Sequence, residues 1–300
     1  MLIPAERKTK MRDKNEIFSL ILKIANEDDR IRAAVLSGSR ANPAIAEDQY
    51  QDYDICFYVT DIKPFYNKPE WITDKLGEVL IMQMPEIMRF PEGDGHFTYL
   101  VIFSDMVRID LSFDFKKYID DGQPAIVLLD KDHGAGMVPV LGKPNDAIWH
   151  IKPPSELYYY SCCNNFWWCL NNAAKGIARD ELPYVMNMLN QIVRTELHDM
   201  INWYIGIHHG FALSTGKDCK YIKKFLPEAI YRQYEKTWCG ADYNDLWDAI
   251  YAMCGLFHDL APAVAERFGF TYRQNEEDAM LKYLRSVRSG IQNSLPLNPS

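Results

Sequence analysis

The chain carries Leu36-Ser37-Gly38-Ser39-Arg40-Ala41-Asn42 and, after a polar loop, Gln51-Asp52-Tyr53-Asp54-Ile55. These two stretches and their flanks predict the core of the fold. Residues 31–37 are mostly apolar and predict a buried strand that ends at Gly38-Ser39, and residues 53–60 alternate as a second strand. Because successive side chains of a strand point to opposite faces, Asp52 and Asp54 should leave the same face.

Two carboxylates held this close repel each other unless a cation lies between them. Mg²⁺ prefers hard oxygen ligands and commonly takes one or two carboxylates together with substrate phosphates. Glycine at position 38 removes the Cβ obstruction, so the backbone of Gly38 and Ser39 could approach such phosphates through its amide groups. The two stretches therefore predict a metal and phosphate site.

A third carboxylate is available on the strand expected at residues 106–113, where apolar and polar positions alternate. Asp110 has the polar parity and should face away from the core. Asp114 shares this parity but lies at the strand end, so it is the less favoured candidate. Three carboxylates could hold two metal ions. Asp-x-Asp alone is also typical of a solvated turn, and the order of strand, Gly-Ser, loop, Asp-x-Asp and acidic strand is far more specific.

The rest of the chain divides into two halves. Further strands are expected at 78–83, 98–103 and 125–129, with a tight hairpin at Ser104-Asp105 and a helix at 15–25. After about residue 145 only helical patterns remain, at 155–177, 182–208, 217–225, 227–237 and 243–268, with Ser155 as the cap of the first. The last dozen residues should form a loose tail.

Composition limits the classes of function. The chain has 300 residues, of which 48% are hydrophobic, and no apolar run approaches the length of a membrane span. Its seven cysteines form no CxxC pair, which favours reduced and mostly buried thiols. The basic first ten residues lack the apolar segment of a secretory signal, and a cytoplasmic location is expected. A net charge of −8 disfavours nucleic acid as a partner. It suits a cationic small substrate, although mild acidity also simply keeps a protein in solution.

The motif order resembles the nucleotidyltransferase superfamily that includes DNA polymerase β. The fuller pattern is similar to the aminoglycoside 6-adenylyltransferases, which modify streptomycin. Further matching stretches extend from near residue 11 to near residue 285 and include Phe57-Tyr58-Val59-Thr60-Asp61, Met82-Gln83-Met84-Pro85-Glu86, Cys162-Cys163-Asn164 and Asn190-Gln191-Ile192-Val193-Arg194. The expected architecture is α+β: an N-terminal nucleotidyltransferase domain at 11–145, with a mixed β-sheet flanked by helices, and a C-terminal all-α helical bundle at 146–288 that binds the substrate.

The resemblance implies transfer of AMP from ATP to a hydroxyl of a streptomycin-like aminoglycoside, with release of pyrophosphate. Asp52 and Asp54 would bind Mg²⁺, and Asp110 would bind a second metal or deprotonate the attacking hydroxyl. Ser39 and Arg40 would contact the triphosphate. ATP and Mg²⁺ would lie in a cleft between the two domains.

Four residues of the helical half are open to two interpretations. The resemblance places Lys217 and Lys220 near the triphosphate, and three-residue spacing on a helix would put them on one face. A solvated basic face that includes Lys223 and Lys224 explains them equally well. Lys175 and Arg194 could reach phosphates, or substrate in the case of Lys175, or pair with acidic side chains.

One departure concerns the acceptor. Family members carry acidic residues around the paired cysteines, and here Tyr160, Ser161 and Asn165 stand at those positions, with Glu156 nearby. Such carboxylates would pair with a guanidinium- or ammonium-bearing drug. Their replacement leaves open nucleotidyl transfer to another small metabolite or to a protein, and a non-catalytic nucleotide-binding or toxin–antitoxin component is a further alternative.

Overall fold

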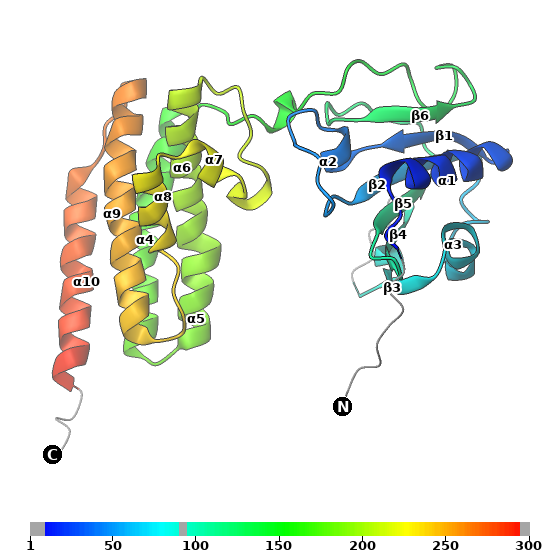
Figure 1. Ribbon diagram of the computed structural model, residues 1–300. Coiled ribbons are helices and arrows are strands. Elements are labelled where there is room, and N and C mark those ends of the chain that lie inside the picture. Colours follow the sequence, from blue (N-terminus) through cyan, green and yellow to red (C-terminus); the bar gives the residue numbers. More distant parts are fainter. Residues whose placement is uncertain (1–9, 90–94, 295–300) are drawn as a thin grey trace, which may run out of the picture. The chain divides into compact units, whose positions relative to one another are not determined.

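The computed structural model describes residues 10–89 and 95–294, which divide into two compact units between Ile148 and Trp149 (Figure 1). The first unit combines a β-sheet with helices, and the second is entirely helical in its described part. The α+β fold class is therefore confirmed. No helix of the described residues has the length and apolar character needed to span a bilayer.

The first unit is built on one mixed sheet of six strands in the order β3-β4-β5-β2-β1-β6. β2 and β5 run parallel, and the other neighbouring pairs are antiparallel. The strands are β1 (Ile31–Leu36), β2 (Tyr53–Val59), β3 (Val79–Gln83), β4 (Phe97–Phe103), β5 (Arg108–Asp114) and β6 (Ile126–Asp130). The expected strands are therefore present, with bounds that differ by one or two residues.

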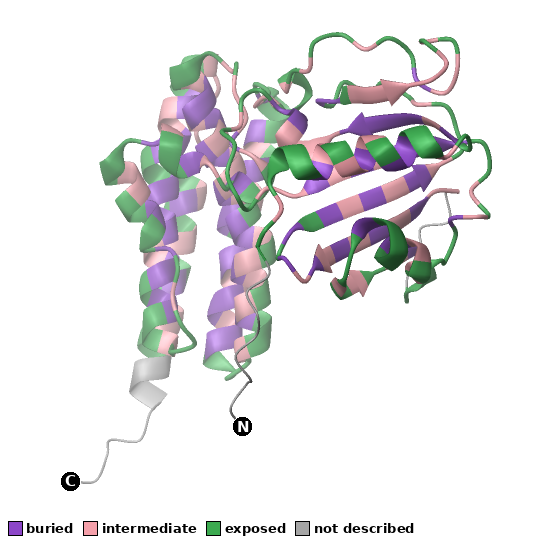
Figure 2. Cartoon of the chain, turned by 45° about the vertical axis from the view of Figure 1, so that its right-hand side comes forward, coloured by how far each residue is buried: buried purple, intermediate pink, exposed green. Residues whose placement is uncertain are grey.

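One face of the sheet packs against helices. The unit's helical segments are α1 (Lys14–Glu27), α2 (Gly38–Ala41), α3 (Pro69–Leu76) and η1 (Pro85–Ile87), and η2 (Ala147–Trp149) spans the division between the units. Ile17 and Ile21 of α1 and Ile72 of α3 are fully buried together with the apolar side chains of β2, β4 and β5. Figure 2 shows α1 lying across the sheet with its exposed residues on the outer side. This core fixes which face of each strand is left for polar side chains.

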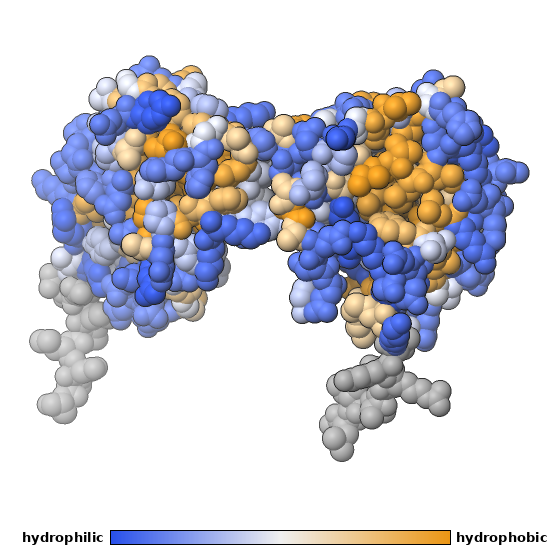
Figure 3. Space-filling model, turned by 45° about the horizontal axis from the view of Figure 1, so that its top comes forward, coloured by the Kyte–Doolittle hydropathy of each residue, from blue (hydrophilic) through white to orange (hydrophobic). Residues whose placement is uncertain are grey.

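The opposite face is covered in part by the chain beyond β5. Val138 is fully buried there against Ala33 and Val35 of β1 and Tyr58 of β2. Figure 3 shows apolar residues gathered at the surface of the first unit, to the right in that view. Ile126 of β6 and Val140 are among the exposed apolar side chains of this unit.

The second unit is a helical bundle around α4 (Glu156–Ala178), which packs against α6 (Arg194–His209), α9 (Tyr243–Phe268) and α10 (Gln274–Ser294). Its core includes Phe166 of α4 stacked on Phe257 of α9, with ring centroids 3.9 Å apart. The remaining segments are α5 (Leu182–Asn187), η3 (Met188–Val193), η4 (Lys217–Cys219), α7 (Ile222–Phe225) and α8 (Glu228–Glu235). All seven cysteines are free, as expected, and five are buried.

Three expectations for the helical half were wrong in part. A π-helical segment, η3, interrupts the helix expected at 182–208. The helix expected at 217–225 breaks because Asp218 and Cys219 have φ values of 53° and 60°, so Lys217 and Lys220 do not share a helical face. The expected tail is helical up to Ser294, because the apolar residues Met280, Leu281, Leu284 and Val287 pack against the bundle. Residues 295–300 lie outside the described residues.

Candidate active site

Gly38 lies directly against the carboxylate of Asp54. The antiparallel pairing of β1 with β2 places Leu36 opposite Ile55, and the Ser37 N–H donates to the Asp54 carbonyl over 2.9 Å. Gly38 has a φ of +66°, and a Cβ at this position would lie 2.0 Å from Asp54 Oδ2. Any other residue would be strained and would displace the carboxylate. The Gly-Ser turn therefore presents backbone, with no side chain from Gly38, beside an acidic group.

Asp54 is the direct partner of Asp110 in the parallel pairing of β2 with β5. The neighbours of Asp110, Ile109 and Leu111, are fully buried on the helix-covered face, so Asp110 projects from the other face. Asp52 immediately precedes β2 and has the same parity as Asp54. The parallel register thus places three carboxylates from two neighbouring strands on the face opposite α1 and α3. Asp114 pairs with Tyr58 farther along, and its Oδ1 accepts from the Lys116 N–H.

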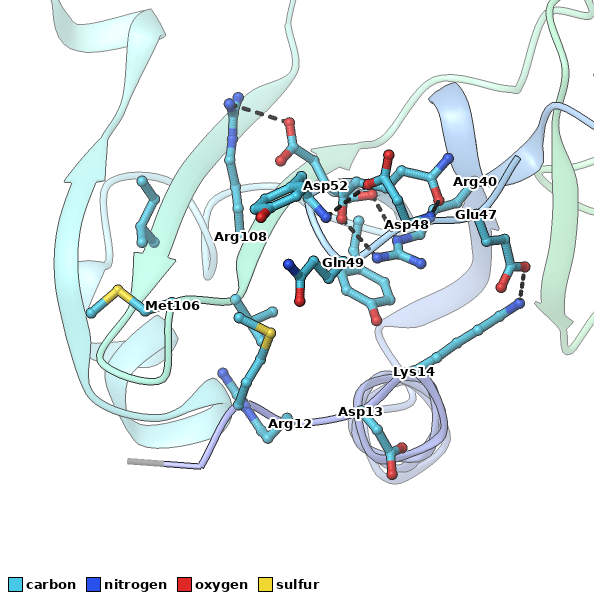
Figure 4. A pocket seen from close by; sticks show the side chains of 16 residues that line it. Arg12, Asp13, Lys14, Arg40, Glu47, Asp48, Gln49, Asp52, Met106 and Arg108 are labelled. Atoms are coloured by element: carbon cyan, nitrogen blue, oxygen red, sulfur yellow. Dashed lines mark hydrogen bonds and ion pairs between the residues drawn. The ribbon is translucent and has the colours of Figure 1, made fainter. Parts of the chain in front are cut away.

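Arg108 joins two of these carboxylates. Its Nε and Nη2 donate to Asp110 Oδ1 and Oδ2 over 2.9 and 2.7 Å, and its Nη1 lies 3.2 Å from Asp52 Oδ2. Figure 4 shows the Arg108 side chain directed toward the Asp52 carboxylate. The guanidinium is therefore bidentate to one acid and paired with a second, which is a strong geometry for an ion pair.

The carboxylates influence one another. Burial, followed by the charges of Asp110 and Asp52, raises the pKa of Asp54 to about 6. Burial also raises the pKa of Asp52, and the charge of Arg108 acts in the opposite direction. Negative charge at this site is thus only partly neutralised by the protein, which favours the binding of a cation.

The donor atoms fit Mg²⁺ in kind. Three carboxylates supply hard oxygen ligands, and Gly38 keeps a side chain away from Asp54 Oδ2. Within the described ranges, however, no three His, Cys, Asp or Glu side chains are arranged around one metal position. Asp52 and Asp110 contact Arg108 instead.

A cavity of about 570 Å³ opens beside Asp52 (Figure 4). Its described lining comes from the start of α1, the loop before β2 and the turn between β4 and β5, and it includes Asp52 and Arg108 but neither Asp54 nor Asp110. Cationic and acidic side chains line it in pairs, such as Lys14 with Glu47. The cavity therefore reaches the carboxylates from the Asp52 side.

Arg40, which the sequence predicts to contact a triphosphate, is engaged with the chain itself. Its Nε and Nη2 donate to the carbonyls of Asp52 and Gln51 over 3.1 and 2.8 Å, and its guanidinium lies over the Tyr53 ring at 3.9 Å. Arg40 therefore holds the backbone that carries Asp52. Ser39 lies in the single turn of α2, next to Gly38.

The cationic residues predicted in the second unit occupy three different settings. Lys217 belongs to η4, and Lys220 follows it with its Nζ 5.1 Å from the Tyr221 ring centroid. Lys175 lies in the last turn of α4. Arg194 is 4% exposed, donates to the Thr237 hydroxyl and carbonyl and stacks on a tryptophan ring, so it has a structural role.

The residues predicted to bind the acceptor lie along α4. Glu156 is exposed in its first turn, and Tyr160 stacks against the guanidinium of Arg273 at 3.6 Å. Asn165 Nδ2 donates to Glu196 Oε1 of α6 over 2.6 Å. The amide that replaces an expected carboxylate thus lies next to a carboxylate on the neighbouring helix.

A second carboxylate, Asp199, lies one turn farther along α6 and accepts from the Tyr158 hydroxyl over 2.7 Å. Burial raises the pKa of both Glu196 and Asp199. Among the described residues, no Lys, Arg or His forms an ion pair with either. The two acids therefore place carboxylates opposite the part of α4 around Asn165, where α4 itself has no acidic residue.

Sequence reasoning missed Arg108, Glu196 and Asp199. Arg108 shares the strand parity of Asp110, so its presence on the same face could have been inferred from the alternation alone. Glu196 and Asp199 are three residues apart on a helix and share a face, but which helix they oppose depends on tertiary packing.

Comparison with known proteins identifies close relatives over most of the chain. Residues 11–287 match the streptomycin adenylyltransferase family. An aminoglycoside 6-adenylyltransferase of Campylobacter jejuni is 36% identical, covering 89% of this chain and 93% of its own. Another from Bacillus subtilis (strain 168) is 32% identical over 94% of this chain and all of its own. A crystal structure of an aminoglycoside 6-adenyltransferase from Bacillus subtilis aligns with 27% identity and a TM-score of 0.46, covering 93% of this chain and 99% of that chain.

Proposed function

The chain belongs to the streptomycin adenylyltransferase family, and we propose that it transfers AMP from ATP to a hydroxyl of a streptomycin-like aminoglycoside and releases pyrophosphate. One observation carries the proposal: Asp54 and Asp110 are direct partners on parallel strands, and Gly38 places backbone without a side chain beside Asp54. The names of the curated relatives, which align with 89–94% of the chain, support the same reaction.

In this proposal Asp52, Asp54 and Asp110 hold Mg²⁺, which would offset the charge that develops on the transferred phosphoryl group. Gly38 and Ser39 bring backbone amides toward the phosphates. Asp110 either completes the metal site or accepts the proton of the attacking hydroxyl, because a neutral hydroxyl is a poor nucleophile near pH 7. Arg40 contributes by holding the backbone of Gln51 and Asp52. Lys217 and Lys220 remain candidates for binding the triphosphate.

The acceptor is proposed to be cationic. Glu196 and Asp199 are partly buried carboxylates next to Asn165 and Tyr158, and a guanidinium or ammonium group would offset the cost of their burial. Glu156, Tyr160 and Lys175 are further candidates for contact along α4. This arrangement supports an aminoglycoside even though Tyr160, Ser161 and Asn165 are not acidic.

The test is release of pyrophosphate from ATP in the presence of Mg²⁺ and each member of a panel of aminoglycosides, with mass spectrometry of the acceptor. We expect streptomycin to gain one AMP group. Replacement of Asp54 by Asn should lower kcat/KM by about 10²-fold or more. Asp114→Asn is the matched control, since Asp114 lies on the same face beyond the site, and it should keep the activity.

Two results would count against the proposal. Pyrophosphate release that survives in Asp54→Asn would exclude the carboxylate site. Modification of a different acceptor, with no aminoglycoside modified, would favour nucleotidyl transfer to a small metabolite or a protein.

A further inference from the structure

Arg108 lies on the same face of the sheet as the three carboxylates of the candidate site. Asp54 pairs with Asp110 in the register of β2 and β5, and Tyr53 pairs with Ile109. Asp52 and Arg108 are the residues that precede this second pair, so they lie side by side. Three carboxylates and one guanidinium thus form a block of four side chains on one face of two parallel strands. The parallel register brings the guanidinium within 3.2 Å of Asp52, and the two-residue spacing on β5 brings it within 2.7 Å of Asp110.

The contacts of Arg108 use the same oxygen atoms that a metal ion would need. Both oxygens of Asp110 and Oδ2 of Asp52 accept from or pair with the guanidinium. A carboxylate oxygen in a bidentate pair with arginine has one of its lone-pair directions occupied, and it lies next to a positive charge that repels a second cation. This agrees with the finding that the described carboxylates do not surround one metal position.

Arg108 is also able to leave. Its side chain is 43% exposed, so the guanidinium can move into water without disturbing the core. Arg40, the other arginine near Asp52, is held by two backbone carbonyls and the Tyr53 ring. Arg108 is therefore the cation of this site that can exchange.

We propose that Arg108 is the resident counter-cation of the candidate site: its guanidinium holds Asp52 and Asp110 in the absence of a divalent cation and must release them before the cation binds. This inference rests on the proposed function, because that function assigns the three carboxylates to metal binding. Arg108 is a positioning residue in this role. It offsets the repulsion between the acidic groups, and it raises the concentration of divalent cation that is needed for binding.

The experiment measures binding of Mn²⁺, as a probe for Mg²⁺, to the full-length protein by electron paramagnetic resonance, with neither ATP nor aminoglycoside present. Arg108→Gln should bind Mn²⁺ about tenfold more tightly than the unchanged protein, because a competing positive charge is removed. Arg108→Lys should give an intermediate affinity, since lysine keeps the charge but not the bidentate geometry. Arg32→Gln, which removes a similar ion pair with Asp132 elsewhere in the unit, should change nothing.

Two additions locate the effect. In Arg108→Gln, the further change Asp54→Asn should abolish the tight Mn²⁺ binding, which assigns it to this site. Without metal, Arg108→Gln should unfold at a lower temperature than the unchanged protein, and added Mn²⁺ should raise its melting temperature by a larger amount. Circular dichroism checks that each variant is folded.

Equal or weaker Mn²⁺ binding by Arg108→Gln, or no binding by either protein, would overturn the inference. Because no substrate is present, these outcomes are independent of the acceptor. Failure to modify any aminoglycoside would overturn the proposed function while leaving the Mn²⁺ result interpretable.

Discussion

Asp54 and Asp110 face each other across the parallel strands β2 and β5. The strands that carry them are far apart in the sequence, and their pairing makes a single acidic site out of two separate motifs. The Gly-Ser turn after β1 lies directly beside this site, because Gly38 has no side chain that would displace the Asp54 carboxylate.

Replacement of Gly38 by Ala should impair both stability and activity. The new Cβ would lie 2.0 Å from Asp54 Oδ2 and the backbone would keep a positive φ, which costs a non-glycine residue about 1–2 kcal/mol. Urea unfolding and the pyrophosphate assay measure the two effects. Gly142→Ala, which has open space around its Cβ, is the control and should be nearly neutral. Full activity in Gly38→Ala would contradict the view that Asp54 must keep its position beside Gly38 for catalysis.

Loss of the Arg12–Asp105 pair should destabilise the first unit. Asp105 is 5% exposed and accepts from Arg12 Nε over 2.6 Å, while Arg12 Nη1 donates to the Leu76 carbonyl. Replacement of Asp105 by Ala should lower the free energy of unfolding by about 2 kcal/mol or more, because a largely buried pair loses one partner. The control is Lys23→Ala in the exposed pair with Glu27, for which a change below about 0.5 kcal/mol is expected.

Removal of negative charge from α6 should weaken binding of the acceptor and leave binding of the nucleotide unchanged. Glu196→Gln should raise the KM for streptomycin about tenfold, because a charge-assisted hydrogen bond is lost, and leave the KM for ATP unchanged. The fold should tolerate the change, since burial disfavours the charged form of Glu196. Glu228→Gln on α8 removes an exposed carboxylate of the same unit and serves as the control. An unchanged KM for streptomycin would exclude Glu196 from the acceptor site.

The His258–Glu277 pair should make stability depend on pH. His258 Nδ1 lies 2.9 Å from a carboxylate oxygen of Glu277, and this hydrogen bond, opposed by burial, raises the pKa of His258 above its usual 6.5. A histidine whose pKa is raised by folding contributes its full stabilisation at pH values below its pKa in the unfolded chain. The contribution is lost as the pH rises through its pKa in the folded protein. His258→Gln should therefore destabilise the protein at about pH 5.5, by roughly 0.5 kcal/mol because His258 is half exposed, with little effect from lost charge at about pH 9. Urea unfolding at both pH values measures it, and an equal loss at both would contradict a charge-based contribution.

Local patterns in the sequence were sufficient for most elements of the fold. The strands that flank Gly38, the alternation around Asp110 and the long helix α9 follow from periodicity, which depends only on neighbouring residues. The failures share a cause. The break at Asp218 depends on contacts that bury Cys219 beside Asn202 of α6, and α10 is held by apolar residues that meet α4 only in the folded chain.

The sequence by itself determined which residues could carry the chemistry: the Gly-Ser turn, Asp52 and Asp54 at the start of β2, and the acidic residue at a polar position of β5. Only the tertiary structure decided how they meet. Side-chain parity is a property of one strand, but the register between two strands is set by hydrogen bonds and core packing across the whole unit. That register pairs Asp110 with Asp54 and brings Arg108 to Asp52, a contact that no spacing along the chain records.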